Sequence, residues 1–259
     1  MNASRLTSIP NAPGGPGQSS PVRDLDEVIC DGMKLPHPWK VRVFVSGESV
    51  GYLAVNELTR EALIVDPVRE DLNQWLAEAK KLEGYRFVAV IDTATHMGHV
   101  SCGARLAGAV QAPYMMNKRA FSSRVQFRVN GDVSLSTQAG PLEFLEAPGH
   151  TADSTVLIWG PMIFTGQTVT YGDTGRSDLP TGNHDVHWDS LQKVKVRAKS
   201  DMVFLPGGDR EGGRASSWST QLRENQSLGQ ARATYVREAL ARSEALPAQF
   251  REALVENFR

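Results

Sequence analysis

The chain has 259 residues, and its 28 Lys and Arg residues nearly balance its 29 Asp and Glu residues, giving a formal net charge of −1. This balance gives no reason to expect nucleic acid or an anionic membrane as a partner. Hydrophobic residues make up 41% of the sequence, as is ordinary for a globular protein with a core, and no apolar run is long enough for a transmembrane helix. The length suits one large α/β domain or two small ones.

The cysteine content and the N-terminal segment both bear on the cellular compartment. Cys30 and Cys102 are the two cysteines, too few for a disulfide framework and typical of a reducing compartment. The N-terminal segment lacks the apolar stretch of a signal peptide. These features predict a cytoplasmic protein.

The first 25 residues differ in composition from the rest of the chain. Residues 1–25 are rich in Pro, Gly and Ser, and such a segment buries too little apolar surface to offset the entropy lost on ordering. We expect a flexible N-terminal arm over residues 1–25, or an arm that docks on a partner subunit, followed by one domain over residues 26–259.

The first half of that domain alternates strand and helix patterns. Short β-rich segments predict strands over residues 40–46, 50–56, 61–66 and 86–92. Apolar residues at helical spacing predict an amphipathic helix over residues 72–82, and a second helix is expected from about His99 to Ala109.

The second half repeats the same kind of order. Further strands are predicted between residues 126 and 145 and over residues 154–160, 162–166 and 202–208, and helices over residues 189–198 and from about residue 217 onward, with a break near Pro247. Two mixed β-sheets with helices outside would accommodate this order.

A polar, His-bearing segment follows the predicted strand that ends at Asp92. It reads Asp92-Thr93-Ala94-Thr95-His96-Met97-Gly98-His99. The segment resembles the signature T-H-x-H-x-D-H of the metallo-β-lactamase superfamily, which also follows a strand. Thr93, His96 and His99 match that signature, whereas Ala94 and Gly98 stand at the positions of its first His and its Asp.

Four later segments resemble further motifs of the same superfamily, in the same order along the chain. They are Ala147–Ser154 (T-P-G-H-T-x-G-S), Phe164–Gln167 (F-T-G-D), Gly175–Leu179 (G-R-T-D) and Leu205–Asp209 (P-G-H-D). The G-R-T-D loop is typical of the persulfide dioxygenase and glyoxalase II branch. The resemblance covers residues 40–259 and implies a four-layered αββα sandwich.

The resemblance also identifies which metal ligands remain. Of the seven ligand positions in the fullest sites of the superfamily, His96, His99 and His150 are kept, while Ala94, Gly98, Gln167 and Gly208 replace a His, two Asp and a His. The iron site of persulfide dioxygenases would use the positions of Ala94, His150 and Gln167, of which His150 alone is kept.

These replacements limit the metal chemistry that the resemblance implies. Two neighbouring dications repel strongly unless carboxylates lie between them, and both carboxylates are missing. One ion is compatible with the residues, because three imidazoles can hold zinc and leave a position for water. His96, His99 and His150 are therefore candidate catalytic residues and metal ligands, with Gln167 as a weak fourth donor. In the family geometry, however, His99 would face the second metal. The cofactor is one zinc or iron ion, or none.

Other residues near these motifs carry separate hypotheses. Cys102, close to His99 and to a predicted helix start, is either a nucleophile with thiolate character or a small buried residue. Arg176 and Asp178 are expected to pair with each other and to support the site from behind. His184 and His187 are a potential metal-binding pair, but we favour a solvated helix start.

Two functional hypotheses follow from the resemblance. The first is an enzyme related to glutathione persulfide dioxygenase and glyoxalase II, acting on a small thiol-derived or thioester-like molecule, such as a glutathione derivative, with at most one metal ion. The alternative is a metal-free enzyme, with His96 or His150 as general base, or a non-catalytic binding protein in the inherited pocket. Relatives of this kind imply a homodimer.

Overall fold

The structure is a computed structural model that describes residues 21–210, 212–242 and 245–259. Part of the expected arm, residues 1–20, lies outside the described residues. The last residues of that expected arm already belong to the fold, because Arg23 and Asp24 pair with the strand that begins at Trp39.

The first sheet contains the N-terminal strands in sequence order. Its seven strands are β1 (Arg23–Asp24), β2 (Trp39–Ser46), β3 (Ser49–Asn56), β4 (Glu61–Val65), β5 (Arg86–Ile91), β6 (Tyr114–Asn117) and β7 (Phe127–Val129). Strands β1 to β4 are antiparallel neighbours, whereas β4 to β7 run parallel.

The second sheet is formed by the C-terminal strands. Its six strands, in spatial order, are β13 (Ser216–Ser217), β12 (Val203–Pro206), β11 (Met162–Gly166), β10 (Thr155–Trp159), β9 (Gly140–Glu146) and β8 (Val133–Thr137). β11 and β12 are parallel, and the other neighbours are antiparallel. Both sheets are therefore mixed, as the sequence predicted.

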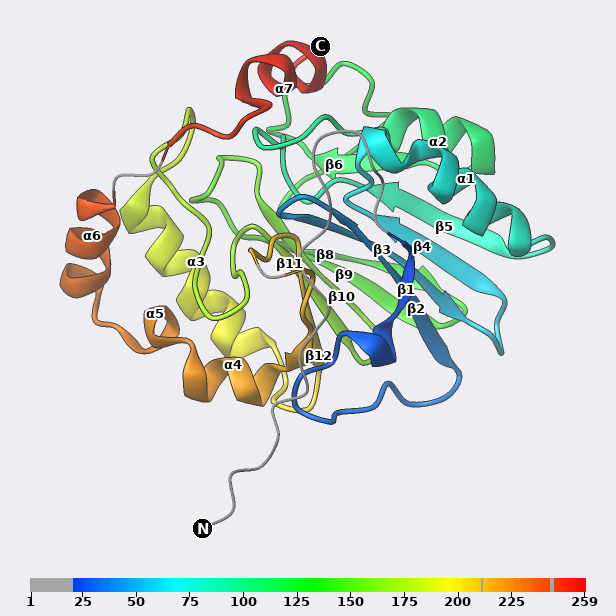
Figure 1. Ribbon diagram of the computed structural model, residues 1–259, viewed down its shortest axis with the longest axis horizontal. Coiled ribbons are helices and arrows are strands. Elements are labelled where there is room, and N and C mark those ends of the chain that lie inside the picture. Colours follow the sequence, from blue (N-terminus) through cyan, green and yellow to red (C-terminus); the bar gives the residue numbers. More distant parts are fainter. Residues whose placement is uncertain (1–20, 211, 243–244) are drawn as a thin grey trace.

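Helices cover the outer faces of both sheets. They are α1 (Leu72–Lys81), α2 (Gly103–Val110), α3 (His184–Arg197), α4 (Trp218–Glu224), α5 (Gln226–Gly229), α6 (Arg232–Ala241) and α7 (Phe250–Asn257), with 3₁₀ turns at Leu25–Glu27 and Arg69–Asp71. Figure 1 shows α1 and α2 on one side, α3 to α6 on the other, and the sheets between them. This is the predicted αββα sandwich. No helix of the described residues is long and apolar enough to span a membrane.

The alternation of side chains along the strands produces three packed layers of apolar residues. Inward-facing residues of the two sheets, such as Tyr52 and Phe164, form the central core. The opposite face of the first sheet packs on α1 and α2, where the ring of Trp75 stacks on Phe44 with centroids 3.5 Å apart. The opposite face of the second sheet packs on α3 in the same way, around Leu191.

Two helices begin at different residues than expected. The second helix begins at Gly103 rather than at His99, because Ser101 bridges to Val68 and the amide of Cys102 donates to Pro67. These contacts hold the preceding residues in an extended loop. The third helix begins at His184, five residues earlier than expected, because the side chain of Asn183 accepts a hydrogen bond from an amide of its first turn.

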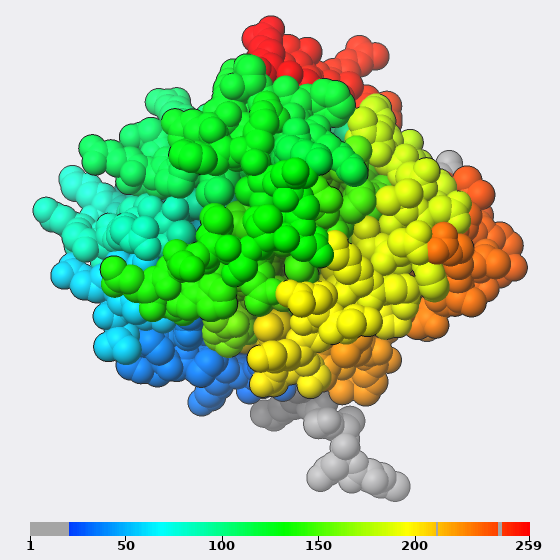
Figure 2. Space-filling view, turned by 180° about the vertical axis from the view of Figure 1, so that it is seen from behind, coloured from blue at the N-terminus to red at the C-terminus, as the bar shows by residue number. Residues whose placement is uncertain are grey.

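The C-terminal helix α7 closes over the loop that carries His96 and His99. Figures 1 and 2 both place this segment, in red, at one end of the molecule. The Asn257 Nδ2 atom donates to the carbonyl oxygens of His96, at 2.8 Å, and His99, at 2.7 Å, while its Oδ1 accepts from the amide of Ser101. One side chain therefore satisfies three backbone groups of the loop.

We predict that Asn257→Ala lowers the free energy of unfolding by about 1–3 kcal/mol, because loop groups lose their hydrogen-bond partners. Chemical denaturation followed by fluorescence measures this loss. The control is Val255→Ala, which alters an exposed side chain of the same helix. Equal stability of the two variants would contradict a role for α7 in holding the loop.

Candidate functional site

A buried carboxylate at the end of β4 holds the start of the His-bearing loop. The Oδ1 atom of Asp66 accepts from the amide of Thr93 at 2.7 Å, and its Oδ2 accepts from the Thr93 hydroxyl at 2.8 Å. The same Oδ1 accepts from His96 Nε2 at 3.0 Å. Asp66 thus fixes both the backbone of the loop and the orientation of an imidazole.

A second carboxylate connects this loop to the turn that carries His150. Asp153 accepts hydrogen bonds from both the amide and the hydroxyl of Thr95, at 2.7 and 2.6 Å. In addition, the amide of Thr155 donates to the carbonyl of Thr93 at 2.8 Å. The two His-bearing turns, which are separated by about fifty residues of chain, are therefore joined directly.

His96 has the environment of a buried cation. Burial alone would lower the pKa of its imidazole, but the charge and hydrogen bond of Asp66, with Asp92 and Asp153 nearby, outweigh it and raise the pKa to about 9. His96 is therefore protonated at neutral pH, and its charge acts on the neighbouring rings.

His99 lies against His96 and stays neutral. The centroids of the two rings are 4.2 Å apart, and the planes are tilted by 31°. Burial and the charge of His96 hold the pKa of His99 well below its usual range. Its Nδ1 is hydrogen-bonded to Ser49 Oγ at 2.9 Å, whereas its buried Nε2 has no hydrogen-bond partner within the described part of the chain.

His150 is held in a similar way by the loop that contains Arg176. Its Nδ1 donates to the carbonyl oxygen of Arg176 at 2.6 Å, so its Nε2 is the unprotonated nitrogen of the neutral ring. Burial lowers the pKa of His150 to about 4, and the charge of His96 contributes. Each of the three predicted imidazoles is thus fixed through one nitrogen.

The residues at the replaced ligand positions pack against one another and do not offer a set of metal ligands. The Nε2 atom of Gln167 donates to the carbonyl oxygen of Gly207 at 3.0 Å. A Cβ atom at Gly208 would lie only 2.6 Å from that Nε2 and 2.8 Å from Oε1. The Gln167 amide therefore occupies the space in which a side chain at position 208 would begin, and Ala94 contributes no ligand atom.

The free nitrogens of the three imidazoles do not form a compact set of ligands. Among the described residues, the trio of His, Cys, Asp or Glu with ligand atoms within 4.8 Å of one another is Asp66, Asp92 and His96, and no such trio contains His99 or His150. In this arrangement, the inherited ligand positions do not fit a metal centre.

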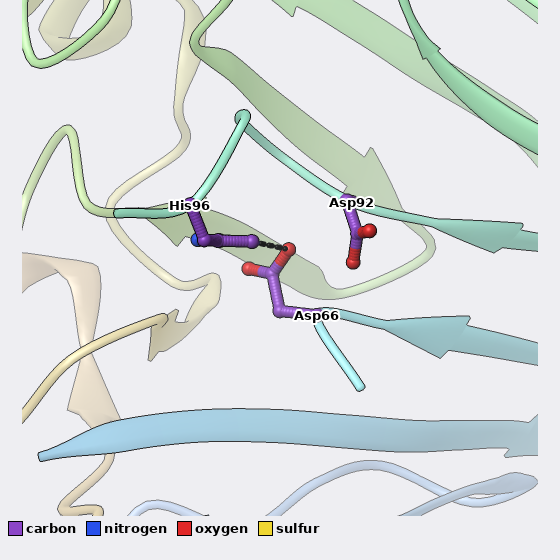
Figure 3. A group of neighbouring side chains, drawn as sticks. All are labelled: Asp66, Asp92 and His96. Carbon is purple, nitrogen blue, oxygen red and sulfur yellow. Dashed lines mark hydrogen bonds and ion pairs between the residues drawn. The ribbon is translucent and has the colours of Figure 1, made fainter. Parts of the chain in front are cut away.

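Asp92 is a site residue that the motif comparison did not identify. Its Oδ2 atom accepts hydrogen bonds from the hydroxyls of Ser101 and Tyr114, whereas its buried Oδ1 has no partner. Burial raises the pKa of Asp92 to about 6. Figure 3 shows Asp92 beside Asp66 and His96.

A signal for this arrangement was present in the sequence. Two predicted strands, residues 61–66 and 86–92, each end in an Asp, and these strands are parallel neighbours with Val65 opposite Ile91. The carboxyl ends of parallel strands meet at one edge of a sheet, which is a common place for ligand sites in α/β proteins. Asp66 and Asp92 are the residues that directly follow these two strands at that edge.

The environment of Cys102 favours a buried thiol over the alternative of a nucleophilic thiolate. The side chain is buried, and its Sγ donates to the carbonyl oxygens of Pro67 and Val68. Burial, together with nearby carboxylates, raises the pKa of the Cys102 thiol well above its usual range. The structure therefore agrees with the simpler expectation of a small buried residue.

The loop after β11 holds the ring of His150 through a backbone carbonyl. Arg176 makes two hydrogen bonds of 2.7 Å to the carboxylate of Asp178, and a third to the carbonyl oxygen of Ala245. This pairing places the Arg176 carbonyl where it accepts from His150. Arg176 and Asp178 thus position an imidazole through the backbone.

The expectation that His187 lies at a solvated helix start is wrong. The residue is fully buried; its Nε2 donates to the carbonyl oxygen of Thr168 at 2.9 Å, and its Nδ1 accepts from the Tyr235 hydroxyl at 2.9 Å. Burial lowers the pKa of His187 to about 3. His187 therefore links α3 to the second sheet and to α6.

Comparisons with known proteins agree with this fold and these motifs. No family model matches the chain. It is 28% identical over 180 residues to the probable polyketide biosynthesis zinc-dependent hydrolase PksB of Bacillus subtilis, covering 66% of this chain and 77% of that protein. The crystal structure of ETHE1 from Myxococcus xanthus superposes with a TM-score of 0.76 and 25% identity, over 84% of this chain and 97% of that one.

A further solved structure, a metallo-β-lactamase from Staphylococcus aureus, has a TM-score of 0.72 and 20% identity, over 86% of this chain and 72% of that one. The sandwich of two mixed sheets, with the His-bearing turns at one edge, defines a metallo-β-lactamase-fold protein. The chain has the fold of this superfamily, and within it the chain is similar to the ETHE1-like branch.

We predict that His187 makes the protein less stable in acid. Its pKa in the folded state, about 3, lies below the unfolded value of 6.5, so the unfolded chain binds the extra proton between these values. The stability is therefore complete above pH 6.5 and decreases as the pH falls toward 3, with a slope of up to about 1.4 kcal/mol per pH unit.

Urea denaturation of the wild type and of His187→Gln at several pH values measures this effect. The difference in unfolding free energy between them should be largest near neutral pH and decrease toward pH 3. His184→Gln, on the same helix, is the control and should follow the wild type. Parallel curves for His187→Gln and the wild type would contradict the prediction.

Proposed function

We propose that the chain is a metallo-β-lactamase-fold enzyme that acts on a small thiol-derived or thioester-like molecule, such as a glutathione derivative, with at most one metal ion. The observation that carries the proposal is the group of buried imidazoles on the inherited turns. Each of His96, His99 and His150 is oriented through a hydrogen bond to one ring nitrogen, and the buried Nε2 of His99 has no hydrogen-bond partner among the described residues. Such preorganised polar groups are typical of catalytic sites.

The protonation states of these rings suit the hydrolysis of a thioester. Neutral His150 accepts a proton at Nε2 from a water molecule as its oxygen attacks the carbonyl carbon. Protonated His96 can donate from Nδ1 to the negative charge that develops on the carbonyl oxygen. The carbon–sulfur bond then breaks, and the proton on His150 passes to the leaving sulfur, giving a carboxylic acid and a thiol.

The similar proteins support this class of reaction. PksB is named as a probable zinc-dependent hydrolase, and the ETHE1 structure matches nearly its whole length to this chain. The resemblance of the G-R-S-D loop, residues 175–178, to the persulfide dioxygenase and glyoxalase II branch supports a thiol-derived substrate.

A second candidate function is a metal-free enzyme or a non-catalytic binding protein. The packing of Gln167 favours this alternative, because its amide occupies the start of the missing side chain at position 208. Ala94 and Gly208 provide no metal ligand, and the amide of Gln167 fills the space next to Gly208.

We predict that the purified protein hydrolyses at least one member of a panel of glutathione and coenzyme A thioesters. The change His150→Ala should lower kcat/KM by about 100-fold or more, because a positioned general base contributes roughly that much. His184→Ala is the control and should keep the activity. Release of free thiol, followed with a chromogenic disulfide, measures the rate.

The same preparation separates an enzyme from a binding protein. Turnover that His150→Ala abolishes supports an enzyme, whether or not it holds a metal ion, whereas tight binding of a thioester without turnover supports the binding protein. Metal analysis after purification should find no more than one ion per chain, and two ions per chain would contradict the proposal.

A further inference from the structure

Three potential metal ligands, Asp66, Asp92 and His96, lie close together on the side of the His96 ring that carries Nε2. The relevant atoms of Asp66, Asp92 and His96 all lie within 4.8 Å of one another, and the three residues are only 1%, 2% and 3% exposed. Figure 3 shows them converging from the ends of β4 and β5 and from the loop that follows β5.

The second observation is the unsatisfied oxygen of Asp92. Its Oδ1 atom is buried and has no hydrogen-bond partner among the described residues, although Oδ2 of the same carboxylate has two donors. A buried carboxylate oxygen without a partner is costly, and such groups call for an explanation such as a bound ion. Asp92 therefore has one oxygen held in place and one available to a ligand.

We propose that Asp66, Asp92 and His96 bind one divalent transition-metal ion, at a site that shares His96 with the inherited ligand positions but does not include His99 or His150. The His96 Nε2 and Asp66 Oδ1 atoms are 3.0 Å apart. Adjacent ligands about 2.1 Å from an ion lie at roughly that separation. An ion bound by both atoms would lie to one side of the line that joins them, and its binding would release the His96 Nε2 proton to solvent.

The charges and ligand types of the trio fit such an ion. Two carboxylates face a single imidazole, so a dication with a neutral imidazole gives a balanced group. Carboxylate oxygens with one imidazole nitrogen suit first-row divalent ions such as manganese, iron or zinc. Further coordination positions remain open to water or substrate.

Neighbouring residues already hold these ligands in position. The hydroxyl of Thr93 holds Oδ2 of Asp66, while Ser101 and Tyr114 hold Oδ2 of Asp92. Such outer partners orient metal ligands and raise affinity.

A cavity beneath α7 reaches two of the three residues, Asp92 and His96. The cavity is also lined by Ser101 and Tyr114, and at its outer end by Arg124 and Glu256. Arg124 lies 3.7 Å from the carboxylate of Glu256, so its charge is partly balanced at the cavity. The site is thus reached from a different side than the space filled by Gln167.

This assignment does not depend on the substrate and is tested without one. Protein freed of metal with a chelator is titrated with Zn²⁺ and, separately, with Mn²⁺ by calorimetry, and bound metal is counted after desalting. We expect one ion per chain and a higher melting temperature with metal. Asp92→Asn keeps an acceptor for Ser101 and Tyr114 but should weaken binding by at least about 10-fold.

His150→Ala is the matched control, because it removes an inherited ligand position and leaves the trio intact. It should bind the ion as the wild type does. If His150→Ala loses the ion while Asp92→Asn keeps it, the ion sits at the inherited positions and the proposal is overturned. Absence of binding in the wild type overturns it as well.

A second measurement shows whether each variant is folded. Without metal, Asp92→Asn should melt at or above the wild-type temperature, because it removes a buried charge, and metal should no longer raise that temperature. A metal-induced increase equal to that of the wild type would also overturn the proposal. Thioester turnover is measured separately, so failure of the proposed enzyme function leaves this result unchanged.

Discussion

The buried carboxylate of Asp66 is the contact on which the geometry of the site depends. It stands where β4 ends, beside the end of the parallel strand β5, and it binds the amide and hydroxyl of Thr93 together with the ring of His96. A buried charge of this kind is stable when its hydrogen bonds are complete and paired. The loop therefore adopts the one conformation that supplies all these donors.

The acidic groups of the site lie beside the motif positions rather than on them. Gly98 and Gln167 stand where the motifs have carboxylates, while Asp92 and Asp153 are buried carboxylates near His96 and Thr95. The glycine at position 208 leaves the room that the amide of Gln167 occupies. The negative charge of the site is therefore gathered around His96 and not around the replaced ligand positions.

The C-terminal helix contributes to the same arrangement from the outside. Asn257 satisfies the carbonyls of His96 and His99, and the helix that carries it closes one side of the cavity next to Asp92. Because these contacts join the end of the chain to the loop after β5, the site and the C-terminal segment are energetically linked.

Much of the fold could be predicted from the sequence because its signals are local. Alternating and helical patterns identified the strands and helices, and five motifs in the right order identified the αββα sandwich and the residues at its edge. The retained imidazoles and the missing ligands were likewise visible in the motifs. Helix starts were less well predicted, as at Gly103 and His184, because contacts with Pro67 and a cap by Asn183 decide them.

Tertiary structure decided how those residues work. The pairing of β4 with β5 brings Asp66 and Asp92 to one edge, and this gives His96 its charge; burial makes His99, His150 and His187 neutral and keeps Cys102 a thiol. A residue's type and spacing determine which groups it can offer. Protonation and coordination depend on burial and on charges from distant parts of the chain, which are set only when the sheets pack.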